Sequence, residues 1–321
     1  MRVAFDVSPL VQSRAGTARH IRGLLGALEG RPGLELDLIS FGGPGRLSSV
    51  ARDALWYPLA LGRSRADVLH CPTFRGPLRS RAPVCLTVHD LAVLRHPEAF
   101  PRWHRLYGAS GLLRRVARRA ELLLTVSEFT KRESVELLGI PESRVRVIGN
   151  AVDEVFTPDG PAAEGGYVLA VGTHEPRKNL ARTIEAAHLA GAELRVAGAP
   201  GWGGIEAAGS LGFVSDEELA RLYRGARCLV YPSLYEGFGI PVLEAMACGC
   251  AVVTSAGTAL EEVAGGAAVL VDPRDPEAIA AGIREAIARR DELRWLGIAR
   301  AREFTWRRVA EAAEAAWQEL A

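Results

Sequence analysis

The sequence has little that would place it in a membrane. It contains no uninterrupted apolar run of roughly eighteen residues, the length that a membrane-spanning helix needs. Residues 1–7 have the character of a first strand, and no long apolar segment precedes them, so a secretion signal is not expected. We therefore expect a cytoplasmic protein.

Cysteine and clustered acidic residues are also scarce. The five cysteines lie mostly within apolar stretches, and one residue separates Cys248 from Cys250, which is closer than the usual spacing of zinc ligands. Reduced and buried thiols are expected. No Asp-x-Asp cluster suited to a divalent cation occurs, so the sequence predicts neither a metal site nor a cofactor.

Charge is balanced over the whole chain but not along it. The formal net charge is +1, whereas residues 1–150 hold 23 Lys and Arg against 13 Asp and Glu, and the remainder holds 16 against 25. The two parts therefore carry +10 and −9. This polarity indicates two domains with different partners, and the basic part suits an anionic acceptor or a membrane surface.

Short apolar strands alternate with helical segments, and the length suits about two domains. Strands are expected near residues 2–7, 34–40, 67–71, 83–89, 121–126, 144–148, 167–172, 192–197, 227–231, 250–254 and 268–271. Helices are expected near residues 16–29, 102–119, 128–138, 179–190, 215–225, 240–248, 259–264, 275–289 and 305–320. Such alternation favours parallel sheets covered on both faces. The sequence therefore predicts two Rossmann-like α/β domains, joined by the proline- and glycine-rich residues 153–166.

Residues 231–247 carry the most informative pattern. A strand ending at Tyr231 is followed by a glycine turn that contains Glu236, and a helix that carries Glu244 begins at Ile240 or Pro241. The first turn of a helix presents free amides and a positive dipole end, which suits a diphosphate. Each carboxylate can accept paired hydroxyl donors. The spacing therefore predicts a nucleotide-sugar site, with a sugar diol on one side of the diphosphate and a ribose diol on the other.

The same stretch resembles the signature of retaining glycosyltransferases of family four, the group 1 type, which have the GT-B fold. Four further segments are similar to motifs of that family and occur in its order: residues 16–20, 87–91, 126–129 and 171–180. The resemblance covers nearly the whole chain. It implies an N-terminal acceptor-binding domain at residues 1–153 and a C-terminal domain for the nucleotide sugar at residues 166–304, facing each other across a cleft.

The last predicted helix has two alternative positions. In the family the C-terminal helix crosses back onto the N-terminal domain, so the resemblance implies that residues 305–321 pack there. A helix that simply closes the second domain is the alternative.

Arg177 and Lys178 come at the start of a helix, where two cations require an anion. They are predicted to clamp the diphosphate together with the amides of Gly239 and Ile240; a solvated basic turn is the alternative. Thr173 stands where many family members have an arginine, so Arg177 is expected to take its place. The family is usually described by front-face substitution, in which the enzyme mainly supplies positioning and electrostatic stabilisation. The resemblance thus makes Lys178 a catalytic residue.

The two glutamates are expected to divide the donor between them. Glu236 is predicted to contact the sugar hydroxyls and to stabilise the transition state, and Glu244 to bind the ribose. For Glu244 the alternative is a first-turn carboxylate that only favours the helix dipole. Phe238 lies between them in the donor-binding stretch. The resemblance also assigns a base-binding loop, made of Gly212, Phe213 and Val214.

The first half of the chain contributes three further candidates. His89 ends an apolar strand, and the resemblance places it near the transferred sugar as a catalytic residue; a structural histidine is the alternative. Asp90 is expected to cap the next segment. Gly16 and Thr17 are predicted to form a turn that helps to cover the phosphates and sugar of the donor. Ala15 stands where the family has the first of two glycines.

The predicted helix at residues 102–119 is basic and amphipathic. Contact with anionic lipid headgroups, with Trp103 at the interface, and a plain solvated face are equal alternatives. Its basic cluster consists of Arg114, Arg115, Arg118 and Arg119.

These features predict a metal-independent, retaining hexosyltransferase that moves a sugar from a nucleotide diphosphate sugar to a glycan or lipid-linked acceptor in polysaccharide synthesis. Residues 172–179 and the Gly-Trp pair at 201–202 look most similar to mannosyltransferases, which favours GDP-mannose over a UDP-sugar. The alternatives are a UDP-GlcNAc 2-epimerase or phosphorylase of the same fold and a non-catalytic sugar-nucleotide-binding subunit. No pyridoxal-lysine motif supports a phosphorylase, and Glu236 and Lys178 argue against the non-catalytic subunit. No nucleic-acid partner is expected.

Overall fold

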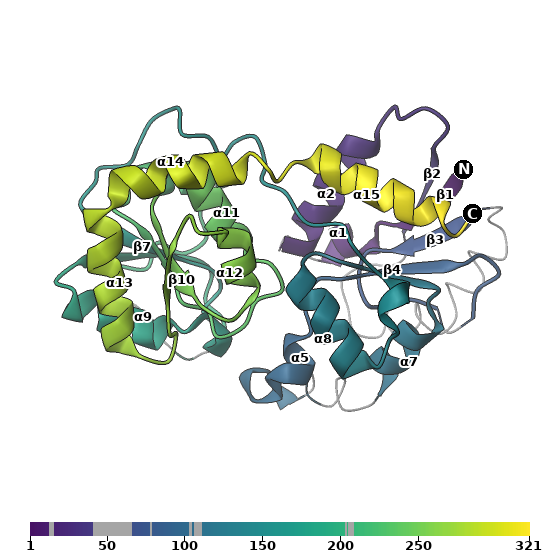
Figure 1. Ribbon diagram of the computed structural model, residues 1–321, viewed down its shortest axis with the longest axis horizontal. Helices are drawn as coiled ribbons and strands as arrows, with labels where there is room; N and C mark the ends of the chain where they lie inside the picture. The colour runs from purple at the N-terminus through teal and green to yellow at the C-terminus, as the bar shows by residue number, and fades with distance from the viewer. Residues whose placement is uncertain are drawn as a thin grey trace. The chain divides into compact units, whose positions relative to one another are not determined.

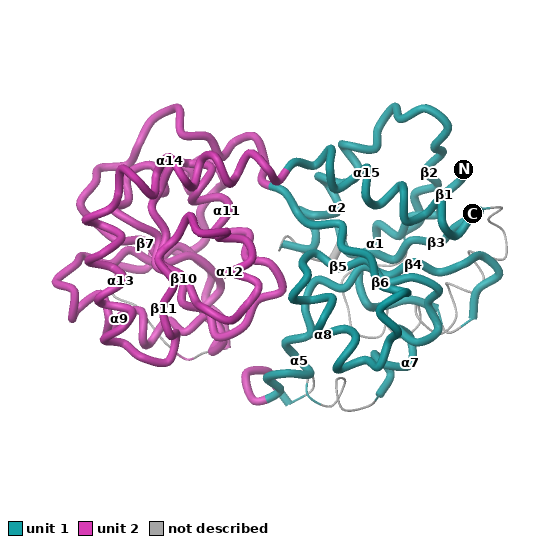
Figure 2. The backbone as a smooth tube through the Cα atoms, viewed as in Figure 1, with its two compact units in different colours: residues 1–97, 102–151, 305–321 teal, residues 98–101, 152–304 magenta. Residues whose placement is uncertain are grey.

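The computed structural model describes residues 1–12, 16–40, 66–77, 79–102, 105, 111–202, 204 and 209–321. The chain divides into two compact units (Figure 2). Unit 1 contains Met1–Pro97, Arg102–Ala151 and Thr305–Ala321, and unit 2 contains Glu98–Pro101 and Val152–Phe304. Each unit is a parallel sheet with helices on both faces (Figure 1).

The sheet of unit 1 has the strand order β2-β1-β3-β4-β5-β6, and all of its paired strands are parallel. All of these strands were predicted, with bounds one or two residues wider. Most are short apolar runs buried on both faces, which is the pattern of a covered parallel sheet. Their bounds are β1 (Arg2–Asp6), β2 (Glu35–Ile39), β3 (Val68–Cys71), β4 (Val84–Val88), β5 (Leu122–Thr125) and β6 (Val145–Val147).

Successive strand residues face opposite sides of this sheet, and different helices cover each side. Helices α2 (Gly16–Leu28) and α15 (Trp306–Gln318) cover the face that carries Phe5, whereas α7 (Leu112–Arg119) and α8 (Glu128–Leu138) cover the face that carries Leu86. The described part of the helix predicted at 102–119 is α7; residues 103, 104 and 106–110 lie outside the described residues. Unit 1 also contains α1 (Ser8–Gln12), α5 (Ala92–Arg95) and the 3-10 helix η3 (Glu142–Arg144). The 3-10 helix η2 (Pro97–Ala99) begins at the last residue of a unit 1 segment and ends in unit 2.

The C-terminal helix α15 lies beside α2 in unit 1 (Figure 1). A Cβ atom at Gly23 would lie 2.1 Å from the ring of Trp306, so glycine at this position lets the indole lie directly on α2. At the other end of α15, Trp317 is fully buried against the sheet. The helix therefore completes the core of unit 1, although the residues of unit 2 precede it in the sequence.

The sheet of unit 2 has the strand order β11-β10-β9-β7-β8, again parallel throughout. Each of its strands corresponds to a predicted one. The order places β7 beside β9, so the loops that follow these two strands emerge next to each other. The strands are β7 (Tyr167–Val171), β8 (Glu193–Ala197), β9 (Leu229–Tyr231), β10 (Val252–Ser255) and β11 (Val269–Val271).

Helices cover both faces of this sheet as well. One face is covered by α9 (Leu180–Leu189) and α13 (Pro276–Ala288), and the other by α10 (Asp216–Gly225), α11 (Ile240–Ala247) and α12 (Ala259–Ala264). Helix α14 (Arg290–Ala301) packs against α11 and was not predicted, because it begins directly after α13 without a proline or glycine between them.

Residues 153–166, predicted as the linker, lie against α10 of unit 2. The guanidinium of Arg224 donates to the carbonyl oxygens of Thr157 (3.0 Å) and Pro161 (2.8 Å), and the amide of Ala163 donates to the carbonyl of Arg221 (3.0 Å). The chain passes from unit 1 to unit 2 between Ala151 and Val152.

Candidate active site

The turn after β7 brings the basic pair into place. It contains the short 3-10 helix η4 (Pro176–Lys178) and leads into α9. Asn179 has a left-handed backbone with φ of 62°, and its side-chain amide donates to the carbonyl oxygens of Pro232 (2.9 Å) and Pro273 (2.6 Å). These bonds tie the turn to the loops after β9 and β11. Arg177 and Lys178 therefore lie beside the loop that carries Glu236.

The turn can lie this close to its neighbour because residue 198 is a glycine. A Cβ atom at Gly198 would lie 1.9 Å from the carbonyl oxygen of Gly172. The side chain of Lys178 also crosses Gly172, with Cε 3.5 Å from the position that a Cβ atom would take. Both glycines thus give the lysine its path to the end of β9.

Glu236 is the centre of a buried ionic group. Its Oε1 lies 2.6 Å from Lys178 Nζ and its Oε2 lies 2.9 Å from Arg177 Nη1. Arg177 Nε is a further 2.8 Å from Glu175 Oε2. The side chains of Arg177, Lys178 and Glu236 are 15%, 15% and 10% exposed. The anion that the basic pair requires is therefore supplied, without a ligand, by the protein's own carboxylates.

The charged side chains of this group shift each other's pKa values. Burial alone would raise the pKa of Glu236, but the charges of Arg177 and Lys178 outweigh it and lower that pKa to about 2. Burial lowers the pKa of Lys178 from its ordinary value, although the Glu236 charge acts in the opposite direction. Near neutral pH, Glu236 is therefore fully ionised.

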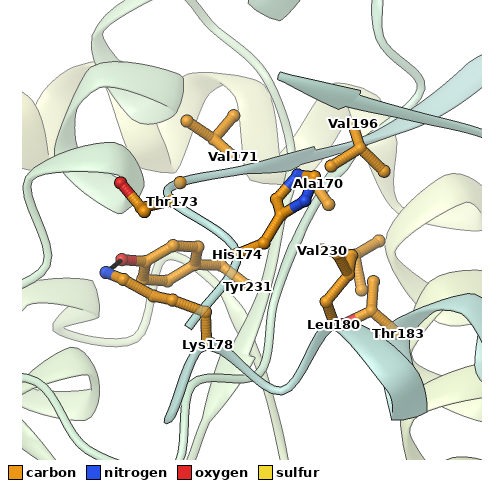
Figure 3. Close-up of a pocket in the computed structure, with 11 residues that line it drawn as sticks. Ala170, Val171, Thr173, His174, Lys178, Leu180, Thr183, Val196, Val230 and Tyr231 are labelled. Carbon is orange, nitrogen blue, oxygen red and sulfur yellow. Dashed lines mark hydrogen bonds between the residues drawn. The ribbon is translucent and has the colours of Figure 1, made fainter. Parts of the chain in front are cut away.

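Tyr231, the last residue of β9, belongs to the same group and was missed in the sequence. Its hydroxyl lies 3.0 Å from Glu236 Oε1 and also contacts Lys178 Nζ, which sits 4.9 Å from the ring centroid. Figure 3 shows the ammonium group of Lys178 at the hydroxyl end of Tyr231, beside a small pocket also lined by Thr173 and His174. A tyrosine at the carboxyl end of a parallel strand was the available signal.

The helix that follows Glu236 starts at a glycine with an unusual backbone. Gly239 has φ of 109°, and a Cβ atom there would lie 2.3 Å from Leu260 Cδ2, so only glycine fits. Pro241 occupies the first turn of α11, as predicted. Within the described part of the chain, the amides of Gly239 and Ile240 donate no hydrogen bond to another protein group. The predicted anion-binding amides are therefore available to a ligand.

Phe238, two residues after Glu236, faces the protein. It is 6% exposed, and its ring meets the ring of Phe304 edge-on at 5.7 Å. This contact fixes the loop between the glutamate and α11.

Glu244 lies one turn into α11 and is 2% exposed. Its Oε2 accepts a 3.0 Å hydrogen bond from the hydroxyl of Tyr223, which is fully buried on α10. A carboxylate placed only for the helix dipole would lie in solvent. The burial and the tyrosine partner instead hold Glu244 in one orientation, and Tyr223 is a second residue that the sequence did not reveal.

The predicted base-binding loop leads from β8 to α10. The carbonyl of Gly212 accepts a 2.8 Å hydrogen bond from the amide of Gly198, so this loop adjoins the turn after β7. Phe213 is 76% exposed. Val214 precedes Ser215, whose hydroxyl caps α10 by accepting from the amide of Glu218.

The remaining candidates lie in unit 1. His89 follows β4, and its Nε2 lies 2.9 Å from the carbonyl oxygen of Pro72, which makes Nε2 the protonated nitrogen of the neutral ring. Burial lowers its pKa.

Asp90 Oδ1 accepts from the amide of Ala92 at the start of α5, as predicted. Gly16 and Thr17 are the first residues of α2 rather than a turn before it, and Ala15 lies outside the described residues.

Two further histidines are buried in unit 1. The ring of His20 meets the ring of His89 edge-on, with centroids 4.9 Å apart, and its Nδ1 lies 3.3 Å from Asn150 Oδ1. His70 stacks on Phe5 at 4.6 Å. Burial lowers the pKa of His20 and brings that of His70 to about 3, so both rings are neutral. His89 thus lies half-buried beside neutral, fully buried histidines.

Half of the basic cluster on α7 has structural partners. Arg114 Nε donates to the carbonyl of Leu137 (2.8 Å), and Arg118 Nε donates to that of Leu138 (3.0 Å), at the C-terminal end of α8. Cations at this end of a helix are favoured by its dipole. Arg115 is left on the exposed side of α7, together with Arg119.

All five cysteines are reduced and buried, as predicted. In the described ranges no three His, Cys, Asp or Glu side chains gather in a way that could hold a metal ion. Among the helices that the structure describes, none combines the length and the apolar character needed to cross a membrane.

Family comparison agrees with this architecture. The family described as Glycosyltransferase Family 4 matches residues 14–156, and the one described as Glycosyl transferases group 1 matches residues 153–303. The chain belongs to these family 4, group 1 glycosyltransferases, so the predicted family, the GT-B fold and the assignment as a sugar-transferring enzyme are confirmed.

Individual proteins similar to this chain include mannosyltransferases. The chain is 33% identical to the O-antigen chain mannosyltransferase B of Escherichia coli over 314 residues, which is 88% of this chain and 78% of that protein. It is 30% identical to the serotype-specific mannosyltransferase WbdA of Escherichia coli over 64% of this chain, but spans only 29% of WbdA. Among solved structures, HepE of Anabaena, in complex with UDP and glucose, has a TM-score of 0.76 at 18% identity and covers 99% of this chain and 100% of that one.

Proposed function

We propose that the chain transfers mannose from GDP-mannose to a hydroxyl group of a growing glycan or lipid-linked sugar, with retention of the anomeric configuration and without a metal ion. The observation that carries the proposal is the buried Glu236 between Arg177 and Lys178, directly before the free amides of Gly239 and Ile240. Two cations, two amides and a helix N-terminus form one anion site, and a carboxylate for hydroxyl groups adjoins it.

The residues of this site would act on different parts of the donor. Lys178 and Arg177 neutralise the diphosphate as it leaves, with the amides of Gly239 and Ile240 as further donors. Glu236 accepts hydrogen bonds from the sugar hydroxyls. The cations already present in the site supply the charge that a divalent cation supplies in other transferases, which is why no metal is included in the proposal.

The nucleoside would bind on the far side of the diphosphate. Glu244 is the group for the ribose hydroxyls, since its carboxylate is held in place by Tyr223. The loop of Gly212, Phe213 and Val214 adjoins the same turn through the bond between Gly198 and Gly212, and it would contact the base.

His89 is proposed to contact a hydroxyl group of the transferred sugar. With Nε2 committed to the carbonyl of Pro72, the neutral ring offers Nδ1 as an acceptor. Such a nitrogen suits a sugar hydroxyl rather than a phosphate.

The choice of mannose and GDP rests on likeness. Two relatives are named mannosyltransferases. A UDP-sugar is the second candidate, because HepE was solved with UDP and glucose. The name of the O-antigen chain mannosyltransferase also favours a polysaccharide or lipid-linked acceptor.

One assay tests the donor, the stereochemistry and the absence of a metal. The purified protein is incubated with GDP-mannose or UDP-glucose and a mannose-terminated acceptor, with and without EDTA, and the product is analysed by NMR. We expect transfer from GDP-mannose, an α-linked product and the same rate with EDTA. An inverted linkage would refute retention, and a rate abolished by EDTA would refute metal independence. Transfer from UDP-glucose alone would refute GDP-mannose as the donor.

A lipid-linked acceptor would bring the enzyme to a membrane surface. We propose that Arg115 and Arg119, two exposed members of the basic cluster, contribute to such peripheral contact, at roughly 1 kcal/mol for each residue near an anionic surface. Co-sedimentation with phosphatidylserine vesicles at low and high salt tests this with an Arg115→Gln/Arg119→Gln variant. Equal binding by the variant and the unaltered protein would reject the patch, and no binding by either would favour a soluble acceptor.

A further inference from the structure

The hydroxyl of Tyr231 has a position that packing does not explain. The residue is 3% exposed, and its aromatic ring alone would fill the space at the end of β9, as a phenylalanine would. A buried hydroxyl costs free energy unless it is hydrogen-bonded. This hydroxyl is bonded to the two charged atoms of the site, Glu236 Oε1 and Lys178 Nζ.

The three groups complete a closed set of hydrogen bonds. The hydroxyl donates to Glu236 Oε1 and accepts from the ammonium group of Lys178, which also donates to Glu236 Oε1 over 2.6 Å. An ammonium group has three N–H donors. Among the described residues Lys178 Nζ reaches only these two partners, so its third donor is free for a ligand.

Glu236 has capacity left as well. Its carboxylate accepts from Lys178 and Tyr231 at Oε1 and from Arg177 at Oε2, and an ionised carboxylate offers about four acceptor positions. In the free protein the two ion pairs and the hydroxyl of Tyr231 together hold this carboxylate. A bound diphosphate would compete with Glu236 for both cations, whereas the neutral hydroxyl of Tyr231 would keep its bond to the carboxylate.

We propose that Tyr231 is a positioning residue of the donor site: it holds Glu236 in place for the sugar hydroxyls when a diphosphate draws Lys178 and Arg177 away from that carboxylate. The proposal rests on the proposed function, because it assigns Glu236 to the sugar and the two cations to the diphosphate. It adds a requirement that ion pairing does not supply. The sugar end of the site depends on an uncharged donor that a phosphate does not attract.

The test uses Tyr231→Phe, which removes one oxygen atom and keeps the ring. Tyr167→Phe is the matched control, since Tyr167 is another fully buried tyrosine of the same sheet and its hydroxyl donates to the carbonyl of Leu222 (2.7 Å), away from the ionic group. Tyr231→Phe loses two hydrogen bonds of a buried hydroxyl and Tyr167→Phe loses one. Comparable thermal stability would show that any difference between them is not a folding effect.

The first readout needs neither donor nor acceptor. Lysine occurs only at positions 131 and 178 of the chain, so lysine labelled with ¹³C at Cε gives two NMR signals, which a Lys131→Arg variant assigns. The hydroxyl of Tyr231 stabilises the charged ammonium group, so Tyr231→Phe should lower the titration midpoint of Lys178 relative to both the unaltered protein and Tyr167→Phe. An unchanged midpoint would overturn the proposal.

The second readout separates binding from turnover. Binding of GDP and of UDP, measured by calorimetry, should change less than about threefold in Tyr231→Phe, whereas turnover with the sugar nucleotide should fall by about 10- to 100-fold, as expected for one hydrogen bond to a charged group. Nucleotide binding weakened as much as in Lys178→Ala would overturn the proposal, because Tyr231 would then serve the phosphate end. If the unaltered protein turns over no sugar nucleotide, the proposed function fails. The titration midpoint of Lys178 then still shows whether the hydroxyl of Tyr231 acts on the ionic group of Lys178 and Glu236.

Discussion

The indole Nε1–H of Trp317 donates a hydrogen bond of 2.9 Å to Nδ1 of His70, although the two residues are 247 positions apart in the chain. His70 lies in β3, near the centre of the unit 1 sheet, and its Nε2 is 3.1 Å from the hydroxyl of Thr87. Both ring nitrogens of this buried histidine are therefore satisfied. The core of unit 1 is complete only when the last helix of the chain is in place.

Replacement of Trp317 should therefore destabilise unit 1 to a degree that depends on what is removed. Trp317→Phe leaves Nδ1 of His70 without a donor and should cost about 1–3 kcal/mol. Trp317→Ala also leaves a cavity and should cost about 3–5 kcal/mol. Urea unfolding followed by circular dichroism measures both. Trp295→Phe is the control, because Trp295 is 68% exposed on α14 and should change stability by less than about 0.5 kcal/mol. Similar losses in all three variants would contradict the role of α15.

The buried histidines should make unit 1 sensitive to acid. His20 and His70 have lowered pKa values in the folded protein because they are buried, whereas an unfolded histidine titrates near 6.5. Their contribution to stability is therefore fully present above about pH 6.5 and is lost as the pH falls, for His70 down to about 3. Each such histidine should lower the free energy of unfolding by about 1.4 kcal/mol per pH unit.

Urea unfolding between pH 7.5 and pH 4.5 measures this slope. His70→Gln keeps an acceptor for Trp317 and cannot be protonated, so its slope should be smaller by one histidine. His188→Gln, at the exposed end of α9, is the control and should keep the slope of the unaltered protein. A His70→Gln slope equal to that of the control would mean that His70 is protonated in the folded state.

Lys178→Ala should abolish most transfer. The leaving diphosphate would lose one charge-assisted contact, worth about 3–4 kcal/mol of transition-state stabilisation, or on the order of a hundredfold or more in rate. Lys178→Arg should recover only part of the rate, because a planar guanidinium cannot reproduce the contacts of the ammonium group with Glu236 and Tyr231. Steady-state kinetics with saturating acceptor measures both. Lys131→Ala, the only other lysine position, is the matched control, and a Lys178→Ala rate close to that control would exclude Lys178 from the mechanism.

The two glutamates should separate by the part of the donor that they bind. Glu244→Gln should weaken binding of GDP or UDP, because an amide loses the charge assistance of the carboxylate toward the ribose. Tyr223→Phe should do the same more weakly, since it removes the 3.0 Å bond that orients Glu244. Glu236→Gln should leave nucleotide binding within a few-fold and depress turnover. Calorimetry with the nucleotide alone distinguishes them, and equal losses in Glu236→Gln and Glu244→Gln would refute the division.

The sequence predicted the strands well and the partners of the site residues poorly. The strands of both units are short apolar runs between turns, and this pattern is local. The contact of Tyr231 with Lys178 depends instead on β9 lying next to β7. The order of strands in a parallel sheet cannot be predicted from the sequence of any single strand. Tyr223 escaped for the same reason, since α10 meets α11 only after the sheet has formed.

The ends of helices could also be predicted only where a local sequence signal marks them. Helix α10 was recognisable because Ser215 caps it, whereas α14 has no side-chain cap and follows α13 directly. The packing of Trp306 on Gly23 was also invisible in sequence, because a glycine inside a helix usually signals a weak point and here marks a contact with the last helix.

The buried cysteines give each unit a chemical reporter of its own opening. Cys71 and Cys85 lie in unit 1, and Cys228, Cys248 and Cys250 lie in unit 2. Burial raises the pKa of Cys228 and Cys248 to about 12, and it raises those of Cys85 and Cys250 further still, so none of these four thiols forms a reactive thiolate in the closed fold. Alkylation must then wait for a fluctuation that exposes the thiol. Mass spectrometry of the labelled peptides would time the opening of the two halves separately, in one native sample and with no residue replaced.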